Sequence, residues 1–430
     1  MDALSLIVAI QNNLLYRVAL FFFAAYPIIM SLVWITTSFF YRSRWEPEIE
    51  ASSGEGETSP DTFQPFVSVV IPVYNEADVI GDAVHAACSL DYPNFEVVVV
   101  NDGSTDDTRA VIENFVTAGM VRIVNKTTNE GKALALNDAI PCLNGEIVLI
   151  IDADAELEPS ALRHMVGHFK SGRVAAVAGN PRVKNVETFL ARLQLIEFAS
   201  IVSLLRRAQR VWGRVITVSG VVAAFRKSAL IDAGLFSPDM PTEDIDLTWK
   251  LQKNYWDVRY EPNAIVWMNV PTTLKGLFKQ RLRWARGLLM VLRRHRGVIA
   301  TWKMRRMWPI FIESSLSVLW ALCFVCLTTI WILSYSLGYP PIGASPIPNL
   351  WGMVIATMCL VQLFVGAWME RRYDREILNY YPYAIYYPIA YWMFTSLCSV
   401  IALPRLFWTP RANPVRWSTP RDVKSTKAAA

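Results

Sequence analysis

The stretch Ile147-Val-Leu-Ile-Ile-Asp-Ala-Asp154 decides the fold, because five consecutive apolar residues lead directly into two carboxylates. A short apolar run with β-branched residues, bounded by turn residues, is typical of a buried strand. Two similar runs, Val67–Val70 and Glu96–Val100, come earlier in the chain and are separated by helical segments. Strands that alternate with helices at this spacing predict an α/β, Rossmann-like domain with a parallel sheet and helices on both faces.

Polar clusters follow the two earlier strands. Tyr74 and Glu76 come after the first strand, and Asp102 lies in Asn101-Asp-Gly-Ser-Thr-Asp106 after the second. Ligands of open parallel sheets bind at the carboxyl ends of the strands, so we expect both clusters at one edge. Asp102 can accept a hydrogen bond from N3–H of a pyrimidine base. The segment around it is also an ordinary turn, and only the pairing of the clusters favours a binding site.

Asp152 and Asp154 end the Ile147–Ile151 strand. At a strand end, the turn allows one carboxylate to face a ribose and the other to face a metal ion. Mg²⁺ or Mn²⁺ binds oxygen ligands, often one or two carboxylates together with diphosphate oxygens, and neutralises charge on a leaving diphosphate. A lone Asp-x-Asp pattern is weak evidence, but the preceding buried strand strengthens it.

A third acidic cluster lies in Met240-Pro-Thr-Glu-Asp-Ile-Asp246. Transfer of a sugar to a hydroxyl group requires a base that takes the proton, and a carboxylate suits this role. Asp244 is our candidate, with Asp246 as a local rival and Glu243 beside it. Thr242 followed by acidic residues also predicts the beginning of a helix, with Thr242 as its N-cap. The two interpretations are compatible.

The segment Gln280-Arg-Leu-Arg-Trp284 places Gln280, Arg283 and Trp284 on one face of a helix. Arg283 can bind a diphosphate, and the indole ring of Trp284 can stack on a sugar. By itself the segment could equally be an amphipathic surface. Lys132, which follows Asn129-Glu-Gly131, is a further candidate for a diphosphate contact.

The composition predicts a membrane protein. Of the 430 residues, 53% are hydrophobic and only 18% are charged, against roughly 25% charged in an average soluble domain. Tyr16–Phe40 is long enough to cross a bilayer, and Arg42 and Arg44 after it place the following domain in the cytoplasm by the positive-inside rule. Three further apolar blocks follow: Pro309–Leu333, Leu350–Trp368 and Tyr381–Leu403.

Two features of the second half bear on the membrane. Residues 271–307 contain eleven Lys or Arg and no Asp or Glu. Because this basic stretch adjoins an apolar block, we expect it to lie on anionic lipids and not to bind nucleic acid. The last block creates a conflict: a single crossing would put the basic tail outside, against the positive-inside rule. A re-entrant or interfacial hairpin is the alternative.

Four blocks, in this order, make the sequence resemble the processive family 2 glycosyltransferases, which include cellulose, chitin and hyaluronan synthases. They are Asn101–Ser104, Asp152–Asp154, Thr242–Asp244 and Gln280–Trp284. The longer stretches Gly179–Val183, Thr217–Arg226 and Leu274–Trp284 resemble the bacterial poly-β-1,6-N-acetyl-D-glucosamine synthases in particular. The resemblance runs from about Phe21 to Arg421.

The resemblance implies a GT-A fold, a divalent metal ion, and inverting transfer from UDP-N-acetylglucosamine (UDP-GlcNAc). It implies roles for residues of this chain: Asp102 on the uracil, Lys132 on the diphosphate, Asp152 on the nucleotide, Asp154 on the metal, Asp244 as base, Gln280, Arg283 and Trp284 on the acceptor end and diphosphate, and Asn180 and Arg182 on the acceptor side. Tyr74, Glu76 and Glu243 complete the expected substrate-binding set.

The resemblance also implies a cellular setting. Such synthases extrude a biofilm polysaccharide through their own helices in the bacterial inner membrane, with the catalytic domain in the cytoplasm. A small membrane subunit and cyclic di-GMP regulate the bacterial system. We expect a membrane helix at 1–45, a linker at 46–65, a GT-A domain at 66–270, interface helices at 271–308, membrane helices at 309–408 and a basic tail at 409–430.

Three alternatives remain at this point. The polymer could be another β-linked one, of the chitin, hyaluronan or cellulose type. The enzyme could instead add one sugar to a lipid carrier, although the Gln280–Trp284 pattern argues against this because single-transfer relatives generally lack it. A transporter or scaffold with a nucleotide-sensing domain is the third, and it predicts no turnover.

Overall fold

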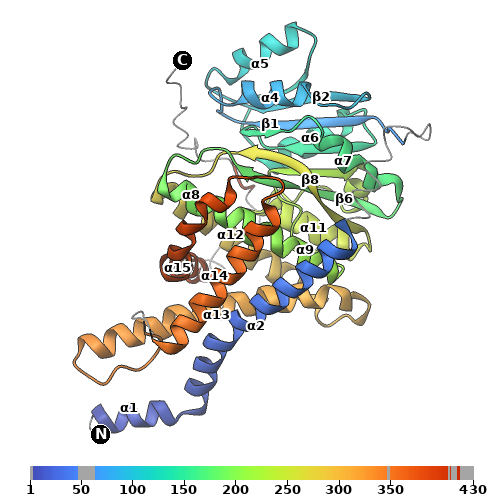
Figure 1. Ribbon diagram of the computed structural model, residues 1–430. Coiled ribbons are helices and arrows are strands. Elements are labelled where there is room, and N and C mark those ends of the chain that lie inside the picture. Colours follow the sequence, from blue (N-terminus) through green and yellow to red (C-terminus); the bar gives the residue numbers. More distant parts are fainter. Residues whose placement is uncertain (1–2, 47–62, 346–348, 405–406, 408–413, 417–430) are drawn as a thin grey trace.

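The computed structural model describes residues 3–46, 63–345, 349–404, 407 and 414–416. The predicted linker (46–65) and basic tail (409–430) lie largely outside these ranges. A sheet domain occupies the top of Figure 1, and long helices occupy the bottom. The chain passes from helix to sheet domain and back to helices, which is the organisation that the apolar ends of the sequence predict.

Among the described residues, eight strands form one sheet in the order β3-β2-β1-β4-β7-β6-β8-β5. The strands are β1 (Val67–Val73), β2 (Phe95–Asp102), β3 (Arg122–Lys126), β4 (Ile147–Ile151), β5 (Ala155–Leu157), β6 (Val174–Val183), β7 (Val222–Arg226) and β8 (Asp257–Met268). Strands β1 to β4 are parallel, whereas β7 runs antiparallel to β4 and β6, and β5 antiparallel to β8. The Rossmann-like α/β class is confirmed. The three predicted strands, β1, β2 and β4, are parallel as expected, and the remaining strands add antiparallel pairs.

Both faces of the central strands are buried, because successive side chains of a strand point to opposite faces. Along β1, Val69 and Ile71 join one core cluster, whereas Val70 joins another. The first cluster includes residues of α4 (Ile80–Cys88), α5 (Thr108–Thr117) and α7 (Ala161–Gly167). The second includes residues of α6 (Lys132–Ala139), α10 (Lys227–Asp232) and α11 (Glu243–Lys253). Two covered faces explain why β1 and β4 are apolar without alternation.

The direction of β7 matters for the site. Because β7 is antiparallel to β4, its first residue, Val222, lies opposite the last residue of β4, Ile151. The turn before β7 therefore lies at the carboxyl ends of the parallel strands, and Asp152 N donates to Val221 O at 3.0 Å. A parallel strand in this place would have brought its other end to this edge.

The described residues contain four helical stretches that are long and apolar enough to cross a membrane: Leu14–Arg44, Trp302–Ser336, Leu350–Glu370 and Ile377–Ala402. They comprise α2 (Leu14–Arg44), η6 (Trp302–Met307) with α13 (Trp308–Ser336), α14 (Leu350–Glu370), and η7 (Ile377–Tyr386), η8 (Tyr387–Tyr391) and α15 (Trp392–Ala402). The short α1 (Ala3–Asn12) precedes α2.

The helices between sheet and membrane are α8 (Phe189–Glu197), the π-helical η4 (Phe198–Val202), α9 (Ser203–Val211) and the long α12 (Leu274–Arg294). Short 3₁₀ turns complete the structure: η2 (Ile140–Cys142), η3 (His168–Lys170) and η5 (Arg296–Val298). One core cluster combines α8, η4, α14, η7 and η8 with Met268 and Leu277. The membrane helices and the sheet domain therefore share buried apolar contacts, which favour a fixed arrangement of the two.

Candidate active site

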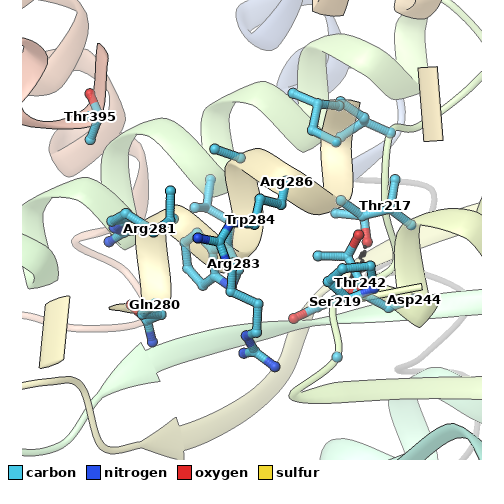
Figure 2. A pocket seen from close by; sticks show the side chains of 18 of the residues that line it. Thr217, Ser219, Thr242, Asp244, Gln280, Arg281, Arg283, Trp284, Arg286 and Thr395 are labelled. Atoms are coloured by element: carbon cyan, nitrogen blue, oxygen red, sulfur yellow. Dashed lines mark hydrogen bonds between the residues drawn. The ribbon is translucent and has the colours of Figure 1, made fainter. Parts of the chain in front are cut away.

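A cavity of about 2120 Å³ lies between the carboxyl edge of the sheet, α11 and α12. Figure 2 shows Asp244 and Ser219 facing the α12 residues Gln280 and Arg283 across it. The structure brings ten of the predicted site residues together in its wall. They are Tyr74, Glu76, Lys132, Asp152, Asp154, Glu243, Asp244, Gln280, Arg283 and Trp284.

Lys132, the first residue of α6, points into an acidic part of the cavity. Its Nζ donates to Asp152 Oδ1 at 2.5 Å and to Gly220 O at 2.9 Å, and lies 3.7 Å from Glu243 Oε1. Burial alone would lower the pKa of Lys132, but the carboxylates of Asp152, Glu243 and Asp244 raise it above its ordinary value. The ammonium group therefore stays charged where a diphosphate would need a cation.

Glu243 belongs to the same cluster, since its Oε1 lies 3.7 Å from Lys132 Nζ. Burial raises the pKa of its carboxyl group, and the neighbouring Asp244 adds to this effect, while Lys132 and Arg283 oppose it. The basic residues thus come from two elements, α6 and α12, and face the acidic residues that begin α11. A charged ligand placed between them meets groups of both signs.

The structure separates Asp244 from its rival Asp246. Asp244 lines the cavity, and its Oδ2 accepts a hydrogen bond from Thr217 Oγ1 at 3.1 Å. Asp246 is fully buried, outside the cavity wall, and accepts hydrogen bonds from Ser237 Oγ at 2.6 Å and from His295 Nε2 at 2.9 Å. Burial would raise the pKa of Asp246, but these hydrogen bonds hold it below its usual value. Asp246 therefore joins α11 to the end of α12.

Thr242 is the N-cap residue of α11, as the sequence predicts. Helix α11 begins at Glu243 as expected, but Thr242 makes no side-chain capping hydrogen bond. Its Oγ1 is buried without a partner among the described residues, as is Oε1 of Gln280. Both residues line the cavity, and the Thr242 side chain packs closely on α12, where a Cβ atom added at Gly287 would lie 2.1 Å from Oγ1.

Trp284 lies in the cavity wall, where two neighbouring side chains contact its indole ring. The guanidinium Cζ of Arg281 lies 4.2 Å from its ring centroid. Phe198 approaches the ring edge-on, with centroids 6.3 Å apart at an interplanar angle of 76°. An indole that is held in this way offers a rigid apolar face on which a sugar can stack.

Asp154 fits a role as a metal ligand. It is 6% exposed and lines the cavity beside Asp152. The part of the chain that the structure describes contains no group of three or more His, Cys, Asp or Glu residues that could hold a metal ion. A Mg²⁺ ion that binds one or two carboxylates together with substrate phosphates does not require such a group. The residues present therefore fit a metal that arrives with a diphosphate.

Asp102 does not line the cavity. Its side chain is fully buried, and its two carboxylate oxygens accept hydrogen bonds from Glu130 N at 3.1 Å and Gly131 N at 2.7 Å. The expected contact of Asp102 with uracil stays a prediction. In this structure the carboxylate holds the backbone that precedes Lys132, so the polar turn after β2 positions a neighbouring loop.

Asn180 and Arg182 do not line the cavity either. Both are buried and contact Glu370 at the end of α14: Asn180 Nδ2 lies 3.3 Å from Oε2, and Arg182 Nη2 forms an ion pair with it. Arg207 of α9 forms a second ion pair with Glu370. The expected role of Asn180 and Arg182 on the acceptor side stays a prediction, and in this structure both residues join β6 to the end of α14.

Several cavity residues were not among the sequence predictions. Ser219 has a positive φ of 92°, an uncommon conformation that turns the chain before β7 and brings the Gly220 carbonyl to Lys132. Val415 and Arg416 line the cavity from the far end of the chain, where Val415 N donates to Pro238 O at 2.8 Å. Local patterns do not indicate such contacts, because they depend on which distant segments meet.

The cavity continues among the membrane helices. Its wall there contains polar and aromatic side chains from α2, α13, α14 and α15. They are Ser31, Trp34, Ser317, Trp320, Gln362, Trp392, Thr395 and Ser399. Ser31 donates to Gln362 Oε1 at 2.6 Å, so this polar pair is satisfied inside an apolar layer. One cavity therefore connects the acidic cluster of the sheet edge with the interior of the helical region.

Comparison with known proteins defines the class. The model of the family described as "Glycosyl transferase family 2" matches residues 68–234. A mannosyltransferase from Pyrobaculum calidifontis, solved with GDP-Man and Mn²⁺, has the same fold: the TM-score is 0.60 at 22% identity, over 88% of this chain and 99% of that one. The protein is a glycosyltransferase with a GT-A fold and a helical membrane region.

The similarity to curated proteins extends over nearly the whole chain. A poly-β-1,6-N-acetyl-D-glucosamine synthase of Staphylococcus epidermidis is 32% identical over 402 residues, 93% of this chain and 97% of that protein. The synthase of the same name from Staphylococcus aureus strain MSSA476 is 33% identical over 422 residues, with the same coverage. The chain therefore belongs to glycosyltransferase family 2, in the group that contains these synthases.

Proposed function

We propose that the protein polymerises N-acetylglucosamine from UDP-GlcNAc into a β-1,6-linked polysaccharide and moves the product into its membrane region. The observation that supports this most directly is the single cavity shared by Asp152, Asp244 and Trp284 with Ser31 and Gln362 of the membrane helices. A polymer that grows at the first three residues would meet polar and aromatic side chains along its exit. The names of the staphylococcal relatives supply the sugar and the linkage.

The residues divide the reaction between them. Lys132 and Arg283 provide positive charge on two sides of the diphosphate, Asp152 lies beside the nucleotide, and Trp284 carries the acceptor sugar. Asp244 takes the proton from the acceptor hydroxyl as the new bond forms on the face opposite the leaving diphosphate, which inverts the anomeric carbon. A Mg²⁺ or Mn²⁺ ion held by Asp154 would neutralise charge on the leaving group.

The membrane setting follows from the same arrangement. Arg42 and Arg44 after the apolar part of α2 support a sheet domain on the cytoplasmic side, where UDP-sugars are found. The basic residues of α12 and η6 lie between the sheet domain and α13 and can contact anionic lipids. A bacterial inner membrane location, a small partner subunit and control by cyclic di-GMP remain part of the proposal through the resemblance alone.

The test uses the purified full chain in lipid nanodiscs with radiolabelled UDP-GlcNAc and Mg²⁺. We expect UDP release and a long product that a β-1,6-specific N-acetylglucosaminidase degrades and a chitinase does not. Addition of one sugar to a lipid would instead support the lipid-carrier alternative. A long product that only chitinase degrades would change the linkage, and a sample that binds UDP but never releases it from UDP-GlcNAc would exclude an enzyme of this kind.

A further inference from the structure

Arg281 lies inside the Gln280–Trp284 segment but has no part in the chemistry above. Its side chain is 6% exposed, and Nη2 donates to Glu197 Oε2 at 2.5 Å and to the phenol oxygen of Tyr391 at 2.7 Å. The hydroxyl of Tyr391 donates in turn to the same oxygen of Glu197 at 2.7 Å. Three buried side chains from three elements thus form a closed set of hydrogen bonds, which holds the Nη2 end of the guanidinium group in place.

The fixed guanidinium group is one wall of the Trp284 site. It lies on the indole ring at 4.2 Å, while Phe198 contacts the ring from its edge. A planar guanidinium combines an ion pair with stacking on an aromatic face, which an ammonium group cannot do. The orientation of the indole ring therefore depends on Glu197 and Tyr391, although Tyr391 is not in the cavity wall.

The two hydrogen-bond partners of Arg281 lie at the ends of π-helical turns. Glu197 directly precedes the π-helical turn η4, and Tyr391 ends the π-helical turn η8. Such turns are rare and occur frequently at functional sites. Tyr387 and Trp392, on either side of Tyr391 in this segment, both line the membrane part of the cavity. Arg281 therefore connects the ring that faces the sheet edge with the segment that leads into α15.

We propose that Arg281, Glu197 and Tyr391 position Trp284 as the platform for the acceptor end of the growing chain. This inference rests on the proposed function, because it assumes an acceptor sugar on Trp284. A platform that tilts holds the acceptor end less well, so the chain leaves more often between transfers. Nucleotide binding, which depends on Lys132 and Asp152, stays as it is.

The experiment compares two substitutions at Arg281, one that keeps the positive charge and one that removes it. Arg281→Lys keeps the charge opposite Glu197 but loses the planar group on Trp284, whereas Arg281→Met loses both. Arg210→Lys serves as the matched control, since Arg210 pairs with Asp257 at 2.9 Å and neither residue lines the cavity. The full chain in nanodiscs is assayed for product length, for KM of a short N-acetylglucosamine oligosaccharide, for KM of UDP-GlcNAc and for the thermal midpoint.

We expect Arg281→Lys to keep the thermal midpoint of the control variant while it shortens the product and raises the acceptor KM about five-fold. The KM of UDP-GlcNAc should not change in either variant. Tyr391→Phe, which removes a single hydroxyl group, should also shorten the product. The inference therefore does not depend on one variant that fails to fold.

Two results would overturn the inference. If Arg281→Lys has the product length and acceptor KM of the unaltered protein, Arg281 serves only the stability of the fold. If acceptor and UDP-GlcNAc KM rise together, the effect is a general disturbance of the site. Failure of the proposed function looks different: the unaltered protein itself then makes no polymer, whereas failure of the inference leaves the unaltered protein active and Arg281→Lys indistinguishable from it.

Discussion

The contrast between Asp244 and Asp246 gives the sharpest test of the proposed mechanism. Asp244→Asn removes the base but keeps the shape of the side chain, and its amide oxygen can still accept the hydrogen bond from Thr217. A general base contributes roughly 10²–10⁴-fold to a rate, which corresponds to about 3–5 kcal/mol in the barrier. We therefore expect kcat to fall by that factor, while UDP affinity stays within about two-fold, since Lys132 is untouched.

Asp246→Asn is the matched control, two residues further along the same helix. Its buried carboxylate accepts hydrogen bonds from Ser237 and His295, and bonds to a charged group contribute about 2 kcal/mol. The thermal midpoint should drop by roughly 4–8 °C, while kcat of the folded protein changes by no more than about three-fold.

The assay is release of UDP from UDP-GlcNAc by the full chain in nanodiscs, with the thermal midpoint measured on the same sample. The reverse pattern, a loss of turnover in Asp246→Asn at unchanged stability and near-normal turnover in Asp244→Asn, would refute the reasoning. It would mean that the ligand-bound active site differs from the arrangement in which Asp244 lines the cavity.

Three further predictions concern the metal ion, acid and the membrane junction. Asp154→Ala, or chelation of divalent ions from the unaltered protein, should abolish the metal-dependent part of UDP affinity in a titration; unchanged affinity at saturating Mg²⁺ would place the ion elsewhere. Because the pKa of Asp246 is held below its usual value, about 3.9 in a model peptide, its stabilising contribution is complete above that pH. It is lost as the pH falls further, and a denaturant titration should show a larger loss of stability in the unaltered protein than in Asp246→Asn. Glu370→Gln leaves Arg182 and Arg207 buried without their charged partner and should cost about 3–5 kcal/mol, seen as a lower thermal midpoint, whereas an unchanged midpoint would mean that water replaces the lost charge.

Local pattern was enough to predict the strands that carry the chemistry. The apolar runs at Val67–Val70 and Ile147–Ile151 are strands, and the residues that follow them line one cavity, because parallel strands end at the same edge. The spacing of Gln280, Arg283 and Trp284 likewise places all three in its wall. In each case a single element determines which way the side chains point.

The remaining features depend on distant partners. Asn180 and Arg182 resemble acceptor-site residues, but Glu370, 190 and 188 positions away, binds both of them. The turn around Asp102 looks like a ligand site, yet the two carboxylate oxygens of Asp102 accept hydrogen bonds from the backbone N–H groups of Glu130 and Gly131. Neither outcome can be read from the sequence around the residue itself, because the competing partner is set by the packing of α14 and α6 against the sheet.

The short segment at residues 414–416 bears on the membrane topology that the sequence left open. Val415 N donates to Pro238 O, and both Val415 and Arg416 line the cavity, so this segment lies on the same side as the sheet domain. An even number of crossings must therefore separate Met268 from Val415. Helices α13, with 29 residues, and α14, with 21, are each long enough to cross.

The last apolar block then has to begin and end on the side of the membrane where the sheet domain lies. By length and hydropathy, Ile377–Ala402 is also a candidate span, but its first part is 3₁₀- and π-helical, and α15 has only 11 residues. At 1.5 Å per residue, α15 covers about 17 Å, roughly half of a 30 Å bilayer core. We infer that this block is re-entrant, which satisfies the positive-inside rule for the basic tail.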